Sequence, residues 1–562
     1  MNTEKDLKLN KRIKRISAAA VLLLVSIFAL IVDANHLFNE MNAAALDESV
    51  SIVDNTCAIN SADDFVAFSK AYQTYPDEYQ NVNIYFAITS GTLSNLDEFV
   101  SIGTADYPFA GNIVAGSTDI NITLDKPLFD YVMDSCGIRD SGGNSKAITL
   151  SRSGSYDTPL FAANVVHDAE SAGGARWEIG ISEYVDSLGG EYTYSFAGVI
   201  GSLGKDAEVE LVLNNNAVDS NGSCSDIVSD SDVGLACKVM NPGSKLTVSV
   251  SGTSTAFNVS SANGSAGGLV GTMSSGSSLI INSAFATGGT VSAGNYAGGL
   301  VGYATDASVT FSDPSYNAIS PTAAGKSGTG GVFGYYRNTA SDFAVTGYNV
   351  DCTLNGAYSG GIFGELVNGG TMTVDGSNDV TVSRTSIDST YTNKDIGGLI
   401  GKYSSETSAC VLTVDGISVN IGKSASADNY GGIIGVINDD SYVHFSNVTV
   451  NAASCNTDIS GSFGGLVGDN TNAFIDAENV TIKTDGEFYG GGVVGNMRSG
   501  VLRFIGKTDL SGAKAGYSSS IKCGQIVGAR GQALIYAQSG WKLIRSSAVT
   551  IDDIGSWGEV LR

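Results

Sequence analysis

The sequence predicts an all-β protein folded as a right-handed parallel β-helix, or solenoid, of about ten coils. Three observations support this fold class. A short glycine-rich motif recurs about every 32 residues. Between its copies lie short runs in which apolar and polar side chains alternate. Between Gly201 and Gly528, no helical periodicity extends over three turns. The repeat therefore indicates stacked strands.

The repeated motif consists of glycine or alanine, glycine, two bulky apolar residues and a final glycine. A ligand-binding loop is normally used once in a chain, whereas many copies at near-constant spacing are typical of a solenoid. We therefore interpret these glycines as architectural and not as a cradle for phosphate. The copies end at Gly201, Gly271, Gly302, Gly334, Gly364, Gly401, Gly435, Gly468, Gly495 and Gly528, and a worn form, VGLAC, covers Val233–Cys237.

The segments between the motifs are typical of strands bounded by turns. Examples are SSLII after Gly271, ASVTF after Gly302 and SYVHF after Gly435, all rich in residues that favour strands. We expect two or three short strands per coil. The motif glycines should either turn the chain sharply or let neighbouring backbones approach closely. A β-propeller is the alternative fold, although its units of about 40 to 50 residues are longer than this period.

These repeats resemble the GLUG-type repeats of bacterial surface proteins, including the non-catalytic repeat regions of some secreted immunoglobulin A peptidases. The resemblance covers Phe196 to Val527, and a fainter similarity lies upstream in SIGTADYPFAGNI and KPLFDYV. It implies an extracellular β-helical stalk or adhesin region. It implies no chemical reaction.

The N-terminus has the composition of an export signal. Lysines and arginines within residues 8–15 precede an apolar run from Ile16 to Val32, and small residues follow. We expect residues 1–45 to be either a cleaved signal peptide or a retained membrane anchor, followed by a linker. Either alternative places the remaining chain outside the cytoplasm, in the extracellular space or at the cell surface.

Three further regions are expected downstream. Residues 46–190 should form a small α+β cap and irregular first coils, residues 191–537 the glycine-rich β-helix, and residues 538–562 a final partial coil or C-terminal cap. Trp541 and Trp557 are the expected packing anchors of that last region.

A short amphipathic helix is predicted near the start of the cap. Ser61 and Asp64 form a capping-box pattern, and apolar residues follow at Phe65, Phe68 and Tyr72. Such a helix could cover the first coil, whose exposed strand edge would otherwise pair with another chain.

The formal net charge of the chain is −26. A field of this sign repels nucleic acid and anionic membranes and keeps an exported protein soluble. We therefore expect no nucleic-acid partner, and membrane contact only through the N-terminal apolar segment.

The eight cysteines form no CxxC pair and are too sparse for a disulfide scaffold. Most should be small buried side chains. Cys224 and Cys237 are the only near neighbours, so they are the one candidate disulfide. No cofactor is predicted, although the acidic turn Ser229–Asp232 could bind calcium weakly.

Two phosphate-loop look-alikes and the histidines give no catalytic motif. In Gly416–Ser424 the glycines are spaced wrongly and the segment alternates like a strand, and the stretch around Lys326 lacks the leading glycine. The three histidines, His36, His167 and His444, form no H-E-x-x-H motif, so no metallopeptidase centre is predicted.

Carboxylates are the remaining candidates for catalysis, because polysaccharide-cleaving sites need carboxylates around the scissile bond. Asp375, Asp379, Asp439 and Asp440 are such candidates, but DGSND and NDDS are also ordinary turn sequences. We therefore predict a secreted or surface-displayed adhesin-like stalk that binds glycan, matrix or other cell-surface ligands without catalysis. The alternative is a β-helical polysaccharide lyase or glycoside hydrolase.

Overall fold

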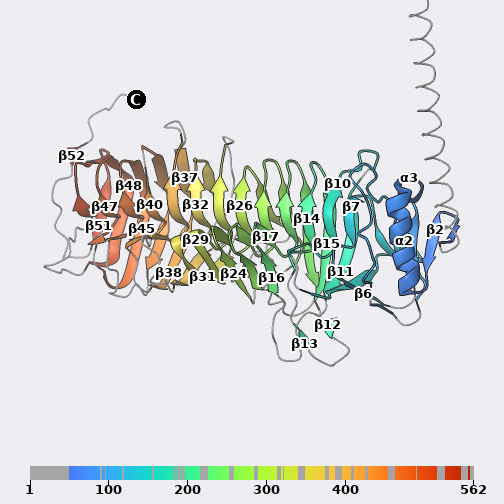
Figure 1. Ribbon diagram of the computed structural model, residues 1–562. Coiled ribbons are helices and arrows are strands. Elements are labelled where there is room, and N and C mark those ends of the chain that lie inside the picture. The colour runs from blue at the N-terminus through green and yellow to red at the C-terminus, as the bar shows by residue number, and fades with distance from the viewer. Residues whose placement is uncertain are drawn as a thin grey trace, which may run out of the picture.

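The computed structural model is a long rod of stacked β-coils, with the helix α2 (Ala62–Thr74) at its N-terminal end (Figure 1). The rod is a mostly β solenoid of about ten turns, which confirms the predicted fold class and excludes the β-propeller. The structure describes residues 50–545 and 555–556, except 89–90, 95, 117–118, 155–156, 172, 182–183, 186–190, 193–195, 216–225, 252–257, 284–288, 313–317, 320–321, 340–348, 374–378, 386–394, 407–410, 425–427, 439, 453–461, 489 and 516–525.

Three long parallel sheets make up the sides of the rod in the described part of the chain. The first has thirteen strands: β7 (Phe129–Met133), β10 (Ala162–Val166), β14 (Ile200–Leu203), β18 (Cys237–Met240), β22 (Val270–Met273), β26 (Val301–Thr305), β30 (Phe333–Arg337), β32 (Phe363–Val367), β36 (Ile400–Ser404), β40 (Ile434–Ile437), β44 (Val467–Asn470), β47 (Val494–Met497) and β49 (Val527–Arg530).

The second long sheet has eight described strands: β4 (Thr92–Leu93), β6 (Ile120–Leu124), β9 (Ala147–Arg152), β11 (Ala175–Ile181), β15 (Glu208–Asn215), β19 (Lys245–Ser251), β23 (Ser278–Ile281) and β27 (Ser308–Phe311).

The third and largest sheet has 24 strands among the described residues. They are β16 (Asp226–Ser229), β17 (Val233–Gly234), β20 (Asn258–Ser261), β21 (Ala266–Gly267), β24 (Thr290–Ala293), β25 (Tyr296–Gly298), β28 (Ala318–Ile319), β29 (Thr322–Gly330), β31 (Asn349–Gly360), β33 (Thr371–Thr373), β34 (Asp379–Thr385), β35 (Asp395–Gly397), β37 (Val411–Asp415), β38 (Ser418–Ser424), β39 (Asn429–Gly431), β41 (Tyr442–Ser446), β42 (Thr449–Ala452), β43 (Ser462–Gly464), β45 (Phe474–Phe488), β46 (Gly490–Gly491), β48 (Val501–Ala515), β50 (Leu534–Ala537), β51 (Lys542–Arg545) and β52 (Gly555–Ser556).

The glycine-rich motif forms the bend between the largest sheet and the thirteen-stranded sheet. Its first bulky residue points into the core, as Leu300 and Val332 do with no exposed surface. The amides of Leu300 and Val301 both donate to the carbonyl oxygen of Val332, at 3.1 and 2.9 Å. The amides of Val332 and Phe333 repeat this pattern onto the next coil. Each bend is therefore hydrogen-bonded to the bend of the following coil.

Close approach of backbones, and not a left-handed conformation, explains the motif glycines. A Cβ on Gly298 would stand 1.8 Å from the carbonyl oxygen of Val301, and a Cβ on Gly431 would stand 1.7 Å from that of Ile434. In the described copies from Gly267 onward, no motif glycine has a positive φ. The sequence predicted either a sharp turn or a close approach of neighbouring backbones at these glycines, and the structure supports the close approach.

The worn copy at Val233–Cys237 is confirmed as part of the array, but its predicted alignment was wrong by one residue. Gly234 pairs with Gly267, and Cys237 pairs with Val270. Lys238 therefore takes the place of the final glycine. The copy that ends at Gly201 aligns as predicted, because Ile200 pairs with Cys237.

The predicted N-terminal helix is confirmed as α2, and the Ser61 side chain accepts a hydrogen bond from the amide of Asp64. A short helix, α3 (Pro76–Tyr79), follows. Beside them lies a small sheet of β1 (Ile52–Val53), β2 (Thr56–Ile59), β3 (Asn83–Phe86), β5 (Ile113–Ala115) and β8 (Ile138–Asp140), and β12 (Tyr184–Val185) pairs antiparallel with β13 (Glu191–Tyr192).

Aromatic side chains join α2 to the first coils. Tyr72 packs against Phe109, Phe109 stacks on Phe129, and Phe129 contacts Phe161, with ring centroids 5.1 to 6.0 Å apart. The chain of contacts ends at Trp177, which is fully buried. The helix is thus continuous with the solenoid core.

Near the C-terminal end, Trp541 stacks on Phe504 with ring centroids 5.1 Å apart, as expected of a packing anchor. Trp557 and the expected leader, residues 1–45, lie outside the described residues. Within the part of the chain that the structure describes, no helix is both long and apolar enough to span a membrane.

Candidate functional site on the outer faces of the coils

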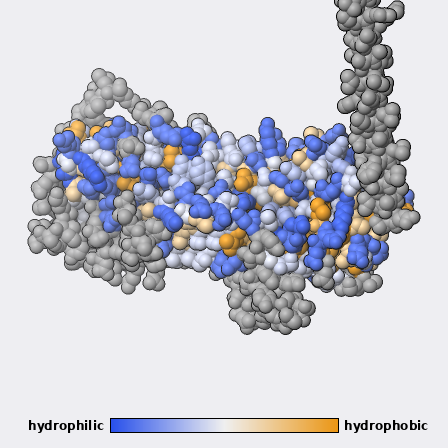
Figure 2. Space-filling view, viewed as in Figure 1, coloured by the Kyte–Doolittle hydropathy of each residue, from blue (hydrophilic) through white to orange (hydrophobic). Residues whose placement is uncertain are grey.

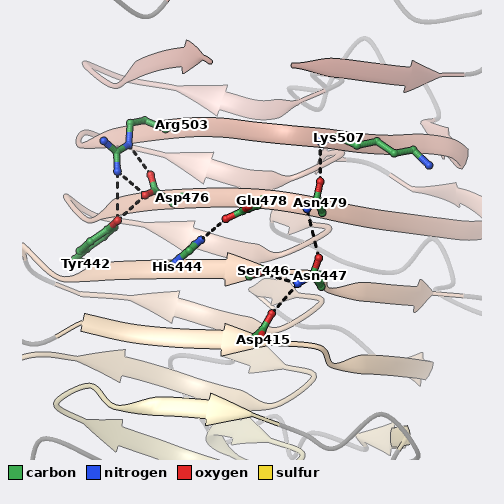
Figure 3. Close-up of polar contacts among 10 residues, drawn as sticks. All are labelled: Asp415, Tyr442, His444, Ser446, Asn447, Asp476, Glu478, Asn479, Arg503 and Lys507. Carbon is green, nitrogen blue, oxygen red and sulfur yellow. Dashed lines mark hydrogen bonds and ion pairs between the residues drawn. The ribbon is translucent and has the colours of Figure 1, made fainter. Parts of the chain in front are cut away.

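The strands β37, β41, β45 and β48 carry a polar network on their outer face (Figure 3). These strands pair in register, so Thr413, His444, Asp476 and Arg503 form one column along the rod. The neighbouring positions on each strand are buried in the core, as in a strand with one solvated face. Alternation along each strand therefore places these polar side chains outside.

Asp476 is the centre of this network and is only 2% exposed. Its Oδ1 accepts from Nε of Arg503 at 2.6 Å, and its Oδ2 accepts from the hydroxyl of Tyr442 at 2.5 Å and from the Arg503 guanidinium. Arg503 also lies over the ring of Phe474, 4.3 Å from its centroid. One buried carboxylate thus links three consecutive coils.

The protonation states of these groups suit a structural contact. Burial, followed by the hydrogen bond to Asp476, raises the pKa of Tyr442 to about 12. Burial acts to lower the pKa of Arg503, but the hydrogen bond and charge of Asp476 raise it above its ordinary value. At neutral pH the phenol stays protonated and the guanidinium stays charged, so neither is ready to transfer a proton.

Beside the contacts of Asp476 with Tyr442 and Arg503, Nε2 of His444 lies 3.1 Å from Oε2 of Glu478 in the next coil. Both side chains are partly exposed, 28% and 34%. The pair could bind a hydroxyl group of a ligand, but a histidine and a single carboxylate without a nucleophile do not make a hydrolytic centre.

An asparagine ladder runs beside these columns: Asn447 follows the end of β41, and Asn479 lies within β45. Asn447 and Asn479 have φ values of 54° and 51°, in the left-handed region. The Nδ2 of Asn447 donates to Asp415 at 3.0 Å, and the Nδ2 of Asn479 donates to Asn447 at 3.4 Å. The amide of Lys507 donates to Oδ1 of Asn479. The ladder holds the turn of each coil to the next.

A second group of polar and aromatic side chains lies at the motif bend, in two columns. One column contains Tyr303, Tyr335, Glu365 and Lys402, and pairing continues it through the buried Val436 to Asp469 and Asn496. The other column runs through Tyr296, Gly328, Tyr358, Asp395 and Asn429. We call the residues Tyr296, Tyr303, Tyr335, Tyr358, Glu365 and Lys402 the bend surface.

Two buried carboxylates follow the bend surface along the rod. Asp395 is 6% exposed and accepts from Asn429 at 2.7 Å, and Asp469 is 2% exposed and is paired with Arg498. Burial, assisted by the charges of Asp469 and Asp428, raises the pKa of Asp395 to about 6, although Asn429 and Arg498 act against this shift.

His167 is held by a third polar contact, near the N-terminal coils. Its Nδ1 lies 2.9 Å from Oδ2 of Asp134, which is 2% exposed. The amides of Asp168 and Glu208 also donate to this carboxylate. The hydrogen bond to Asp134 raises the pKa of His167. Asp134 therefore links neighbouring coils by hydrogen bonds. The third histidine position, His36, lies outside the described residues.

Of the predicted catalytic carboxylates, only Asp440 has a side chain among those that the structure describes. Asp375 and Asp439 lie outside the described residues, and Asp379 begins strand β34. Asp440 is exposed and accepts a hydrogen bond from Asn472 in the next coil. Asp440 thus takes part in a surface turn contact, as the turn interpretation predicts.

The remaining predicted sites are the candidate disulfide, the acidic turn and the two segments that resemble phosphate loops. Cys237 is a buried free thiol, and Cys224 lies outside the described residues. Both carboxylate oxygens of Asp232 accept hydrogen bonds, from the Ser265 amide and the Thr272 hydroxyl. Lys326 lies within β29, and Gly416–Ser424 leads into β38, so neither segment has the strand-to-helix loop of a phosphate site.

Among the described residues, no group of histidine, cysteine, aspartate and glutamate side chains is arranged to hold a metal ion. Comparisons with known proteins found no matching family model, no matching curated protein and no matching solved structure.

Proposed function

We propose that this chain is an exported, surface-displayed solenoid that acts as an adhesin-like stalk. In this proposal its outer faces bind glycan, matrix or other cell-surface ligands, and no bond of the ligand is cleaved. The export signature of residues 8–34 and the resemblance to GLUG-type repeats support the location.

One observation carries the non-catalytic part of the proposal. Three buried outward carboxylates are committed to cationic partners one coil away: Asp476 to Arg503, Glu365 to Lys402, and Asp469 to Arg498. Catalytic carboxylates must be free to approach substrate. These pairs instead hold neighbouring coils together and present a closed polar surface.

The surface of the rod is consistent with a binding role in an aqueous environment. Figure 2 shows a visible face that is mostly hydrophilic or intermediate, with small, separate hydrophobic areas. A large continuous apolar patch would indicate an obligate protein interface. The visible face therefore supports contact with hydrated ligands.

A cleaving enzyme remains the second candidate, because of Asp395. A carboxyl group with a pKa of about 6 has the raised pKa of a general acid, and the charge of Asp469 contributes to that shift. If Asp395 and Asp469 were a catalytic pair, Asp395→Asn would abolish cleavage of the ligand. If the chain is a binding stalk, the natural chain cleaves nothing, and Asp395→Asn changes only its stability.

Export and binding can be tested on the full chain carrying a C-terminal epitope tag. Antibody and external protease should reach the tag on intact cells, and cells that display the chain should adhere to glycan- or matrix-coated surfaces. A tag that is protected until the cells are lysed would contradict the location. Displayed protein without any adhesion would contradict the binding role.

A further inference from the structure

The bend surface brings together four tyrosines from three successive coils: Tyr296 and Tyr303 flank the same motif copy, and Tyr335 and Tyr358 follow on the next two coils. Tyr296 lies on β25 of the largest sheet, just before the bend, and Tyr303 and Tyr335 lie on neighbouring strands of the thirteen-stranded sheet. The centroid of the Tyr296 ring lies 6.1 Å from that of Tyr303 and 4.9 Å from that of Tyr335. The two columns therefore meet as one continuous surface across the bend.

The geometry of the rings determines what this surface presents. Tyr303 and Tyr335 stack with their planes 4° apart and their centroids 4.6 Å apart, so each ring covers one face of the other. Tyr296 is tilted by about 50° to both. All three side chains are partly exposed. Stacked rings with exposed outer parts offer ring edges and phenol hydroxyl groups to a ligand.

The hydroxyl groups of Tyr296 and Tyr335 are held in their protonated form. Burial is the main factor that raises the pKa of Tyr296 and of Tyr335 well above the ordinary value. A protonated phenol both donates and accepts hydrogen bonds. The surface can thus bind groups of either polarity, as sugar hydroxyls require.

A carboxylate and an ammonium group extend the surface along the rod. The hydroxyl of Tyr296 donates to Oε2 of Glu365 at 3.4 Å, and the Oε1 of Glu365 accepts from Nζ of Lys402 at 2.6 Å. The same Nζ lies 4.9 Å from the centroid of the Tyr358 ring. The two opposite charges compensate each other, so this part of the surface is close to neutral.

Charge then limits the class of ligand. The chain as a whole carries −26, which disfavours a polyanion anywhere along the rod. The bend surface has no uncompensated positive charge that would offset this repulsion, and its polar groups are hydroxyl, carboxylate and ammonium. A neutral, hydroxyl-rich ligand matches these groups.

Spacing favours a polymer over a small molecule. In the column of Tyr303, Tyr335, Glu365 and Lys402, consecutive positions lie on paired strands and are therefore about 4.8 Å apart. An extended polysaccharide has a repeat of similar length, one sugar unit. A chain that lies parallel to the rod can therefore place successive sugar units against successive coils.

We infer that the bend surface binds an extended, neutral polysaccharide that lies parallel to the rod axis. Tyr296, Tyr303 and Tyr335 contribute hydroxyl groups and ring edges, and Glu365 with Lys402 binds the sugar hydroxyls of the neighbouring unit. This inference rests on the proposed function, because it names the ligand class and the surface of a binding stalk.

The test measures binding of the purified full chain to insoluble cellulose, chitin and β-1,3-glucan, with polygalacturonate as the anionic comparison. Tyr296→Phe, Tyr303→Phe and Tyr335→Phe remove the hydroxyl groups and keep the rings. Each should weaken the affinity for the bound neutral polymer about threefold to tenfold, because each removes one hydrogen-bonding group. Tyr85→Phe is the matched control, since Tyr85 is a partly exposed tyrosine on β3, more than 200 residues before the bend surface in the sequence.

Thermal unfolding of each variant shows whether the fold is retained. Weaker binding by the three bend variants, with unchanged unfolding and an unchanged Tyr85→Phe control, would support the inference. Unchanged binding by those variants, loss only in Tyr442→Phe, or preference for polygalacturonate would overturn it and leave the stalk proposal standing. If the chain binds no polysaccharide, the inference fails, and cell adhesion then decides separately whether the proposed function fails too.

Discussion

Gly298 and Gly334, which belong to consecutive coils, lie so close that a Cβ on Gly298 would stand 2.7 Å from the amide nitrogen of Gly334. The same Cβ would stand 1.8 Å from the carbonyl oxygen of Val301. Because both neighbours are backbone atoms, they cannot move aside by a rotamer change. This contact explains why glycine recurs in the motif.

Gly298→Ala should therefore destabilise the protein by about 1–3 kcal/mol or more, as overpacking does. Chemical denaturation monitored by circular dichroism measures this change. Gly173→Ala is the matched control, because nothing lies within 4 Å of a Cβ at that position, and it should change stability by less than about 1 kcal/mol. Equal stability of the two variants would contradict the close-approach explanation.

The buried carboxylate of Asp476 should be strongly coupled to Arg503. Asp476→Ala should cost about 2–4 kcal/mol, because it leaves a guanidinium that is only 20% exposed without its carboxylate. A double-mutant cycle with Arg503→Ala should give a coupling energy above about 1 kcal/mol. The pair of Lys245 with Glu208 is more exposed, at 42% and 44%, and its coupling should stay below about 1 kcal/mol. Additive effects at Asp476 and Arg503 would contradict this network.

The asparagine ladder predicts a preference for glycine over alanine at position 479. Asn479→Ala and Asn479→Gly both remove the side-chain hydrogen bonds, but only alanine must also keep a φ of 51° with a Cβ. Asn479→Gly should therefore be the more stable variant by about 1 kcal/mol. The denaturation midpoints of the two variants test this, and the opposite order would show that the turn relaxes to another conformation.

Asp395 should make the protein less stable as pH rises. The folded-state pKa of Asp395, about 6, lies above the usual value of a carboxyl group. The contribution of Asp395 to the free energy of unfolding is therefore fully present below about pH 4 and is lost as pH rises through 6. Asp395→Asn should be more stable than the natural chain above pH 6, by up to about 3 kcal/mol, and this advantage should shrink towards pH 4. An advantage that is constant from pH 4 to 8 would contradict the shift.

The sequence predicts the repeating bend well over residues 197–528, because the glycine motif and its two core residues recur there in nearly every coil. It does not predict the alignment of Val233–Cys237, because coil length varies from 27 to 37 residues and so does not fix the register. Pairing with Gly267 and Val270 decides that alignment.

The outer polar contacts were missed for a related reason. Sequence reasoning favours carboxylates that are adjacent in the chain, such as Asp439 and Asp440. The structure instead joins residues one or two coils apart, such as Tyr296 to Glu365. In a solenoid the neighbours on a face come from different coils, and only the register of the strands reveals them.

The most direct test of the central claim is the chain length of a polysaccharide after incubation with the purified full chain. Pectins, glucans, mucin glycans and immunoglobulin A are incubated with and without calcium and then separated by size. We predict that a bound polysaccharide co-elutes with the protein and keeps its original length. Reproducible shortening that disappears in Asp395→Asn, or in Asp375→Asn, Asp379→Asn, Asp439→Asn or Asp440→Asn, would contradict a binding stalk and establish a cleaving enzyme.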